Sequence, residues 1–318
     1  MATIDDELAG LRSKMEEELM ASLKAGTSVF KYVPNNIGEI LYCDSSNPKA
    51  EPDTKEQTRK KIIYSIIIPL AIIVFCWLVF NESPIFDTIV TIVMGIISIY
   101  SINKCLSFKG KDYFVGTEGA VEITFEKTRD NITNKTEAFF RDFEDLVTSE
   151  TKKYKNSVYQ GTEYSFIVYG HESDGEKKVV AGIEGTYNQE EPKDYYIDRI
   201  YRFWKKIETY WSQYKLALLK DALTNGEPIG FNVYTDKNFY NDYIVFKDKE
   251  ISIHGKAYNK DNIKKWYFKN GNLIIEDVNH STKFLGLISK GDKETIPLSI
   301  IGNRELFFTF FQFFVSTL

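Results

Sequence analysis

One stretch of the sequence limits the fold more than any other, because it runs for 19 residues without a charged side chain. It extends from Ile62 to Phe80 and reads IIYSIIIPLAIIVFCWLVF. A helix of about 20 apolar residues crosses the hydrocarbon core of a bilayer. A second run, residues 85–102, contains one acidic residue, Asp87, near its start. Four residues separate the runs, so the sequence predicts a transmembrane helical hairpin over residues 62–102, with spans at 62–80 and 85–102.

Basic residues flank the outer ends of both runs and are absent from the turn between them. They are Lys55, Arg59, Lys60 and Lys61 before the first run, and Lys104, Lys109 and Lys111 after the second. Segments rich in lysine and arginine remain on the cytoplasmic side of a membrane. The pattern therefore predicts a multi-pass protein of the plasma (inner) membrane with both termini in the cytoplasm. Neither run has an ionisable residue at its centre, which disfavours a transporter or pump.

The segment before the hairpin divides into two parts. Residues 1–26 predict an amphipathic helix that places Leu8, Leu11, Met15 and Leu19 on one face. Its polar face is acidic, so we expect it to dock on protein rather than on a membrane surface. Residues 27–61 contain two short β-like runs, VFKYV and IGEILYC, and then a polar linker. The two runs either pair as a hairpin or add a strand to a later sheet.

From residue 109 the pattern changes to short strands with tight turns, which is typical of an antiparallel sheet or a small barrel. A helix follows at 192–224, with Pro192 at its first position and Gly226 after its end. Strands then recur, and Asn270-Gly271 is typical of a two-residue hairpin turn. A final helix at 303–317 is apolar nearly all round and too short to span a bilayer, so we expect it to be buried.

Strands followed by one C-terminal helix therefore occur twice, and this order resembles pleckstrin-homology-like (PH-like) domains. The segment IKKWYFKNGNLIIED (263–277), with Ile296-Pro297-Leu298 and the helix after Asn303, is similar to bacterial PH-like membrane proteins. IGEILY (37–42) is similar to segments that precede the hairpin in such proteins. The resemblance implies an α+β fold with membrane helices and two tandem PH-like domains, 109–225 and 226–318, each a sheet or partly open barrel plus a helix. It implies no reaction and supplies no catalytic residues.

The predicted helix at 192–224 carries a bulky apolar seam at helical spacing. Its members include Ile200, Trp204, Ile207, Trp211 and Tyr214. A seam of this length must be covered along the whole helix. The cover comes either from this protein's own domains or from a sister chain, and in the second case the seam is an interaction surface.

A search for chemistry yields no catalytic, cofactor-binding or metal-binding residues. The three histidines are scattered, and the cysteines are Cys43, Cys76 and Cys105, which leaves none in the C-terminal half for a zinc site. The sequence also lacks the nucleophile elbow, the P-loop and the dinucleotide-binding turn in a strand–helix context. A formal net charge of −5 disfavours a nucleic-acid partner. We therefore expect a protein that is not an enzyme and needs no cofactor.

Basic residues near the membrane remain as candidates for lipid contact. They are Lys60, Lys61, Lys109, Lys111, Lys127 and Arg129. Such residues attract anionic headgroups when they lie close to a leaflet. Acidic residues are interleaved with them, so an ordinary solvated surface is the alternative.

The first functional hypothesis is a membrane-anchored, non-enzymatic scaffold that presents two cytoplasmic PH-like domains to a protein partner or to copies of itself. The second is a lipid-headgroup-binding or envelope-sensing module, and the third is an enzyme whose site lies between the domains. An exposed apolar groove or sheet edge favours the first hypothesis, and positive potential facing the bilayer favours the second. A deep pocket with converging polar groups favours the third.

Overall fold

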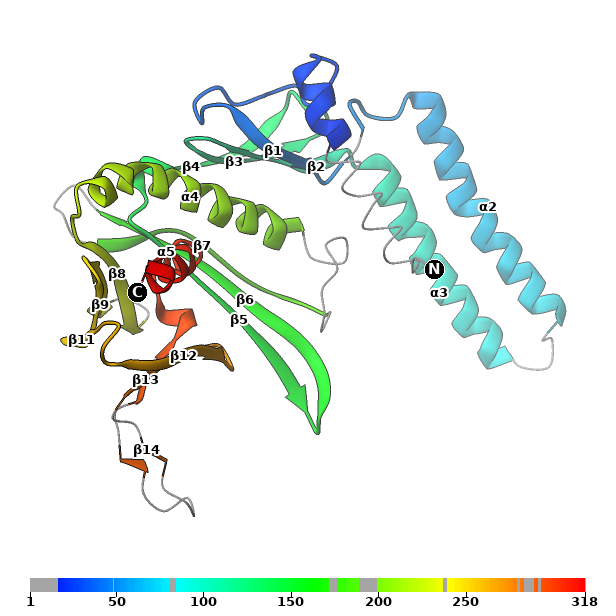
Figure 1. Ribbon diagram of the computed structural model, residues 1–318. Coiled ribbons are helices and arrows are strands. Elements are labelled where there is room, and N and C mark those ends of the chain that lie inside the picture. The colour runs from blue at the N-terminus through cyan, green and yellow to red at the C-terminus, as the bar shows by residue number, and fades with distance from the viewer. Residues whose placement is uncertain are drawn as a thin grey trace, which may run out of the picture.

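The structure is a computed structural model that places a two-helix hairpin beside two units of sheet and helix (Figure 1). It describes residues 17–47, 49–79, 84–171, 177–188, 199–236, 239–278, 281–282, 289–290 and 293–317. We call the two units the first module, which comprises strands β1 to β7 and helix α4, and the second module, which comprises strands β8 to β16 and helix α5.

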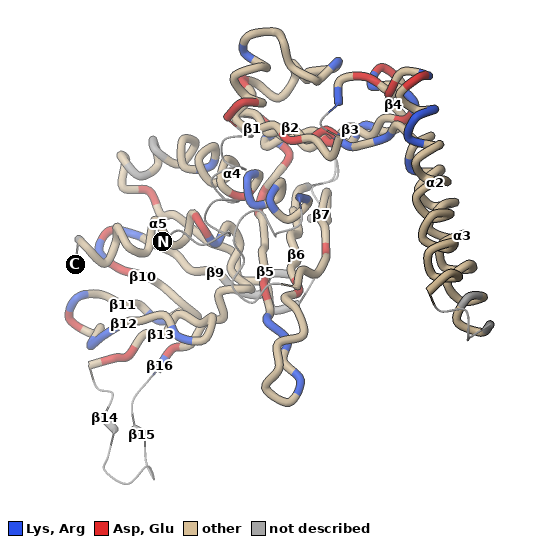
Figure 2. Tube along the Cα trace, turned by 90° about the vertical axis from the view of Figure 1, so that its right-hand side faces the viewer, with Lys and Arg blue, Asp and Glu red and all other residues tan. Residues whose placement is uncertain are grey.

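The hairpin consists of α2 (Lys55–Val79) and α3 (Pro84–Leu106), and both helices are long and apolar enough to cross a membrane. Helix α2 begins with a capping box, in which the Gln57 amide donates to Thr54 Oγ1 and the Thr54 amide donates to Gln57 Oε1. The two predicted spans are thus confirmed as helices, and each extends further on its basic side. The lysines and arginines of both helices all lie where the hairpin joins the first module (Figure 2).

The hairpin is inserted between two neighbouring strands of one sheet. Strand β1 (Ile40–Ser45) precedes it and β2 (Lys109–Gly116) follows it, and the two pair antiparallel with Cys43 opposite Phe114. Strands β3 (Gly119–Glu126) and β4 (Ile132–Phe139) complete a four-stranded sheet in chain order. Of the two alternatives for the early β-like runs, the added strand is therefore correct. The first module begins before the hairpin and not at residue 109, and the polar linker shortens to the residues between β1 and α2.

A second sheet and a helix complete the first module. Strands β5 (Asp145–Lys155), β6 (Val158–His171) and β7 (Lys177–Tyr187) follow the short 3-10 helix η1 (Phe140–Asp142). Helix α4 (Arg199–Thr224) closes the module and ends where the sequence predicts, whereas its predicted start lies outside the described residues. The core between the sheets and α4 is rich in aromatic side chains, among them Phe140, Phe166 and Trp211.

The N-terminal segment covers the other face of the β1–β4 sheet. Residues 17–24 are helical, and Leu19, Met20 and Leu23 pack against a buried cluster that includes Phe30 and Phe114. Alternation along β1 explains the two faces, because Tyr42 faces the core under α4 while Cys43 faces the N-terminal segment. The prediction that the N-terminal helix docks on protein is confirmed for Leu19. Leu8, Leu11 and Met15, the other residues predicted on its apolar face, lie outside the described residues.

The second module repeats the order of four strands, three strands and a helix. Its first sheet contains β8 (Ile229–Asp236), β9 (Phe239–Lys247), β10 (Glu250–Ile253) and β11 (Lys256–Tyr258). Its second sheet contains β12 (Ile263–Lys269), β13 (Asn272–Asp277) and β16 (Lys293–Pro297), with the small pair β14 (Ser281–Thr282) and β15 (Ser289–Lys290) before β16. The 3-10 helix η2 (Leu298–Ile300) leads into α5 (Arg304–Thr317). Asn270 and Gly271 both have positive φ, which confirms the predicted turn.

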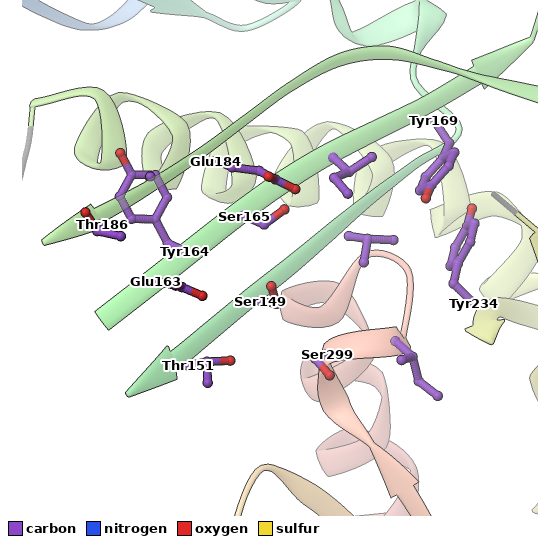
Figure 3. A pocket seen from close by; sticks show the side chains of 14 residues that line it. Ser149, Thr151, Glu163, Tyr164, Ser165, Tyr169, Glu184, Thr186, Tyr234 and Ser299 are labelled. Carbon is purple, nitrogen blue, oxygen red and sulfur yellow. The ribbon is translucent and has the colours of Figure 1, made fainter. Parts of the chain in front are cut away.

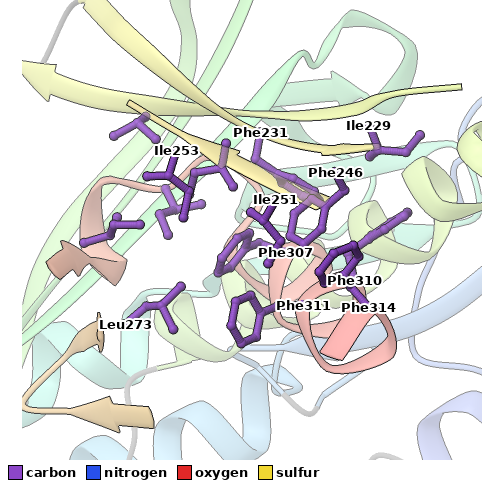
Figure 4. Close-up of a cluster of buried hydrophobic side chains, with 14 of the residues drawn as sticks. Ile229, Phe231, Phe246, Ile251, Ile253, Leu273, Phe307, Phe310, Phe311 and Phe314 are labelled. Carbon is purple, nitrogen blue, oxygen red and sulfur yellow. The ribbon is translucent and has the colours of Figure 1, made fainter. Parts of the chain in front are cut away.

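The phenylalanines of α5 fill the core of the second module (Figure 4). Phe307, Phe310 and Phe314 surround Phe231 and Phe246 with ring centroids between 5.4 and 6.3 Å apart. The expectation that this short apolar helix is buried is confirmed for the face that carries Phe307, Phe310, Phe311 and Phe314, whereas Phe313 on the opposite face is 64% exposed.

Candidate functional site

An open groove of about 730 Å³ lies on the outer face of the β5–β7 sheet (Figure 3). Strand alternation creates this face, because Leu146 and Thr148 of β5 are buried on the inner side while Val147 and Ser149 line the groove. The second module contributes Tyr234 of β8 and residues of η2. The groove therefore needs both modules in their observed arrangement. We call it the sheet groove.

Hydroxyl and carboxylate side chains give the sheet groove its chemistry. They include Ser149, Thr151, Ser165, Thr186 and Ser299, together with Glu163 and Glu184. Its described lining contains no lysine or arginine. Glu163 forms an ion pair with Lys153 beside the groove. Such a lining can exchange hydrogen bonds with an extended chain, and its two carboxylates, one of them already paired with Lys153, give it negative formal charge.

Two tyrosines mark the junction of the modules at the end of the sheet groove. The rings of Tyr169 and Tyr234 stack with their centroids 4.5 Å apart and an interplanar angle of 15°. Burial, and then the nearby Asp145 carboxylate, raise the pKa of both hydroxyls. Both tyrosines therefore stay neutral at physiological pH, and the Tyr234 hydroxyl donates a hydrogen bond to Asp145.

A buried polar network fixes this junction, and we call it the interface network. It consists of Asp145 and Trp211 of the first module with Asn232, Tyr234 and Asn303 of the second. Asn303 Oδ1 accepts from Trp211 Nε1 at 2.8 Å and from the amide of Leu146 at 2.9 Å. Asn303 Nδ2 donates to Asp145 Oδ1 at 2.7 Å. Asp145 and Asn303 are 3% and 5% exposed, so the network holds the modules together through desolvated hydrogen bonds.

A second polar link joins the modules through Glu208 of α4. Glu208 is 2% exposed, and its side chain accepts from Thr148 Oγ1 at 2.8 Å. Lys205 Nζ lies 2.6 Å from one of its oxygens and Arg304 of α5 lies 3.7 Å from the other. This buried charge is paired from both modules, as a desolvated carboxylate requires.

The apolar seam of α4 is internal and is not an exposed interaction surface. Ile207 and Trp211 are each 1% exposed, and Ile200, Trp204 and Tyr214 pack against the same cluster in the first module. The seam is covered within the chain because the two sheets of the first module supply aromatic side chains along it. Near the end of α4, Leu219 and Ala222 pack on the core of the second module. For the five seam residues from Ile200 to Tyr214 the cover therefore comes from this protein's own domains, whereas Leu218, further along the same helix, is 61% exposed.

Arg129 is buried, so it is not a lipid contact in this structure. It is 3% exposed and its guanidinium lies 2.6 and 2.7 Å from the two carboxylate oxygens of Asp112. It also donates to Ser45 Oγ and to the backbone oxygens of Asn47 and Lys49. We call this set the Arg129 node. It ties β1 and the linker, which precede the hairpin, to β2, which follows it.

The five lysines proposed as lipid contacts are all at the surface, but three of them have acidic partners. Lys60 lies 2.7 Å from Glu56, Lys61 lies 2.5 Å from Asp53, and Lys111 lies 2.6 Å from Glu122. Lys109 and Lys127 have no carboxylate within ion-pair distance among the residues that the structure describes. The structure brings only Lys61 and Lys127 together, in a cavity at the base of the hairpin.

Sequence reasoning did not identify the residues that hold the modules together. Asp145 lies in a charged stretch of an acidic chain, and Asn303 precedes a helix, where asparagine normally serves as a cap. Their partners are more than 85 residues away in sequence. The one available signal for the sheet groove was the run of hydroxyl residues at outward positions of β5 and β6.

Metal chemistry has no support in the described part of the chain, where no group of three or more His, Cys, Asp or Glu side chains could hold a metal ion. Comparison of the chain with protein-family models, with curated proteins and with solved structures finds no match in any of the three. The functional argument therefore depends on the geometry of this chain alone.

Proposed function

We propose that the protein is a membrane-anchored, non-enzymatic scaffold that presents two PH-like domains to a protein partner at the cytoplasmic face of the plasma membrane. The repeated order of four strands, three strands and a helix supports the PH-like interpretation of both modules. The basic residues at the outer ends of both spans support the cytoplasmic orientation.

The observation that carries the proposal is that buried polar contacts link the hairpin base to the first module and the first module to the second. The Arg129 node secures both stems of the hairpin. The interface network secures the second module. A surface built from both modules is thereby held in one position relative to the anchor, which is what a scaffold needs and what a tethered, freely moving domain would lack.

The sheet groove is the proposed partner site, and its occupant is an extended protein segment that carries lysine or arginine. Its length along three strands suits an extended chain, and its Glu163 and Glu184 carboxylates suit a basic one. The lining hydroxyls supply hydrogen bonds to a backbone. We place no reaction in this groove.

The experiment is site-specific photo-crosslinking of the full-length protein in its native membrane. A photoreactive residue at Ser165 samples the groove, and the same residue at Thr136, which is exposed on β4, is the matched control. We expect a discrete adduct at Ser165 only, and mass spectrometry of the adduct should identify a basic segment of another protein. The charge reversal Glu163→Lys/Glu184→Lys should abolish the adduct.

Two results would contradict this assignment. Equal adducts at the groove and control positions would show that the groove has no specificity. An adduct that persists after the charge reversal would show that the bound segment is not recognised through its basic residues. A crosslinked peptide from a second copy of this chain would mean that the groove binds another copy of the protein and not a different protein.

A further inference from the structure

A cavity of about 530 Å³ lies at the base of the hairpin, where α2 and α3 join the first module. Its walls come from the linker before α2, the first turns of α2, the last turns of α3 and the turn between β3 and β4. The charged side chains that line it are Lys49, Asp53, Lys61, Lys104 and Lys127. We call it the base cavity.

Positive charge dominates the base cavity. Lys49 Nζ and Lys61 Nζ each lie 2.5 Å from an oxygen of Asp53, the only carboxylate among its described lining residues. The two ammonium groups lower the pKa of Asp53, so this carboxylate stays ionised. Within the described chain, Lys104 and Lys127 have no carboxylate partner. The lining thus has a formal excess of three positive charges.

The base cavity lies at the depth where the apolar part of the hairpin ends. Lys61 immediately precedes the uncharged run of α2, and Lys104 is in the last turn of α3. An adjoining hollow of about 600 Å³ shares Lys104 and adds Tyr100 and Lys109. Tyrosine and lysine at the end of a span are typical of the headgroup region. The cavity therefore opens where lipid headgroups lie.

The walls of the base cavity are held in place before any ligand binds. Arg129 binds the backbone oxygens of Asn47 and Lys49, which fixes the linker. The amide of Lys127 donates to the carbonyl of Phe108 at 2.6 Å, which fixes the β3–β4 turn against the end of the hairpin. Buried Arg129 thus positions other residues around the cavity and does not contact the ligand.

We propose that the base cavity binds the phosphate-bearing headgroup of an anionic phospholipid, with Lys104 and Lys127 as its main charged contacts. Phosphate oxygens are strong acceptors for ammonium donors. A membrane lipid is the source because exposed apolar surface of α2 and α3 continues directly from the cavity, where acyl chains can lie. The inference does not depend on the sheet groove, which lies on a different sheet.

The test compares lipid retention by the full-length protein and by two charge-matched double variants. The protein is reconstituted in nanodiscs of phosphatidylcholine with or without phosphatidylglycerol, and native mass spectrometry counts the retained lipid. Lys104→Gln/Lys127→Gln removes the proposed contacts. Lys247→Gln/Lys249→Gln removes two exposed lysines near the β9–β10 turn of the second module and is the control. Circular dichroism confirms that all three proteins are folded.

We expect phosphatidylglycerol to be retained in preference to phosphatidylcholine by the unmodified protein and by the control. Retention by Lys104→Gln/Lys127→Gln should be roughly 30-fold weaker, since each basic side chain close to an anionic leaflet contributes about fivefold. Equal retention by both variants, or no preference for phosphatidylglycerol, would overturn the proposal. Titration with inorganic phosphate in detergent separates the sources: lysine-dependent phosphate binding without lipid preference would mean that the site takes a free anion.

Discussion

Replacing Asn303 by aspartate should destabilise the interface network by an amount that depends on pH. The substitution keeps the acceptor for Leu146 and Trp211 but places a second carboxylate 2.7 Å from Asp145 Oδ1. Two buried carboxylates at that distance cannot both be ionised, so the folded state retains one proton and the pair's pKa rises. Holding a proton on a group with an ordinary pKa of about 3.9 costs about 4 kcal/mol at pH 7 and about 1.5 kcal/mol at pH 5.

The sign follows from proton binding. Above about pH 4 the folded variant binds more protons than the unfolded chain, so its stability falls as the pH rises toward the raised pKa of the pair. Chemical unfolding of the full-length protein in detergent, followed by tryptophan fluorescence at pH 5 and pH 7, measures the difference. Asn134→Asp, at an exposed position of β4, makes the same chemical change and should cost less than about 0.5 kcal/mol. A penalty for Asn303→Asp that is absent or independent of pH would refute the reasoning.

Two further substitutions test the first module. Arg129→Met leaves the buried Asp112 carboxylate without its cationic partner and with the Ser45 hydroxyl still donating to it. We therefore expect a loss of about 3–5 kcal/mol in unfolding free energy and faster proteolysis of the linker before α2. Unchanged proteolysis would show that the Arg129 node does not secure the linker. Gly116→Ala places a Cβ 2.2 Å from the backbone oxygen of Ile37 and should cost more than about 2 kcal/mol, whereas Gly230→Ala meets nothing within 4 Å and should be tolerated. Similar thermal midpoints for these two variants would contradict the close approach at Gly116.

The elements that depend on local pattern were predictable from the sequence. The apolar runs of the hairpin, the Asn270-Gly271 turn and the apolar α5 each carry a signal within a few residues, because helix length, positive φ and burial are local demands. The apolar seam of α4 was also predictable, but the elements that pack against it were not. Periodicity tells which face is buried and not which chain buries it.

The contacts that organise the candidate sites are distant in sequence, and this is why they were missed. Arg129 lies in a turn, where arginine is normally solvated, and only the pairing of β2 with β3 and β1 brings Asp112 and Ser45 to it. β1 itself was ambiguous because its partner strand begins only after the two apolar helices α2 and α3. Local sequence patterns predict that such residues are exposed to solvent. Pairing of the strands buries them instead, because it excludes water from their surroundings.

Insertion of the hairpin between β1 and β2 also constrains the membrane topology, independently of charge. Adjacent strands pair only if both are on the same side of the bilayer, and the register of β1 with β2 spans five residue pairs from Ile40 to Ser45. The chain between them must therefore cross the membrane an even number of times. One span with a re-entrant or surface-lying companion would leave β1 and β2 on opposite sides, and the sheet could not form.

This argument predicts same-side labelling of the residues on either side of the hairpin. In a background in which Cys43, Cys76 and Cys105 are replaced, Ala50→Cys samples the linker and Thr136→Cys samples β4, both at exposed positions. A membrane-impermeant maleimide should modify both from one side of sealed vesicles and neither from the other, because the β1–β2 pairing fixes the two segments together. Labelling of the two cysteines from opposite sides would mean an odd number of crossings, and the paired β1–β2 sheet would then be untenable in the membrane.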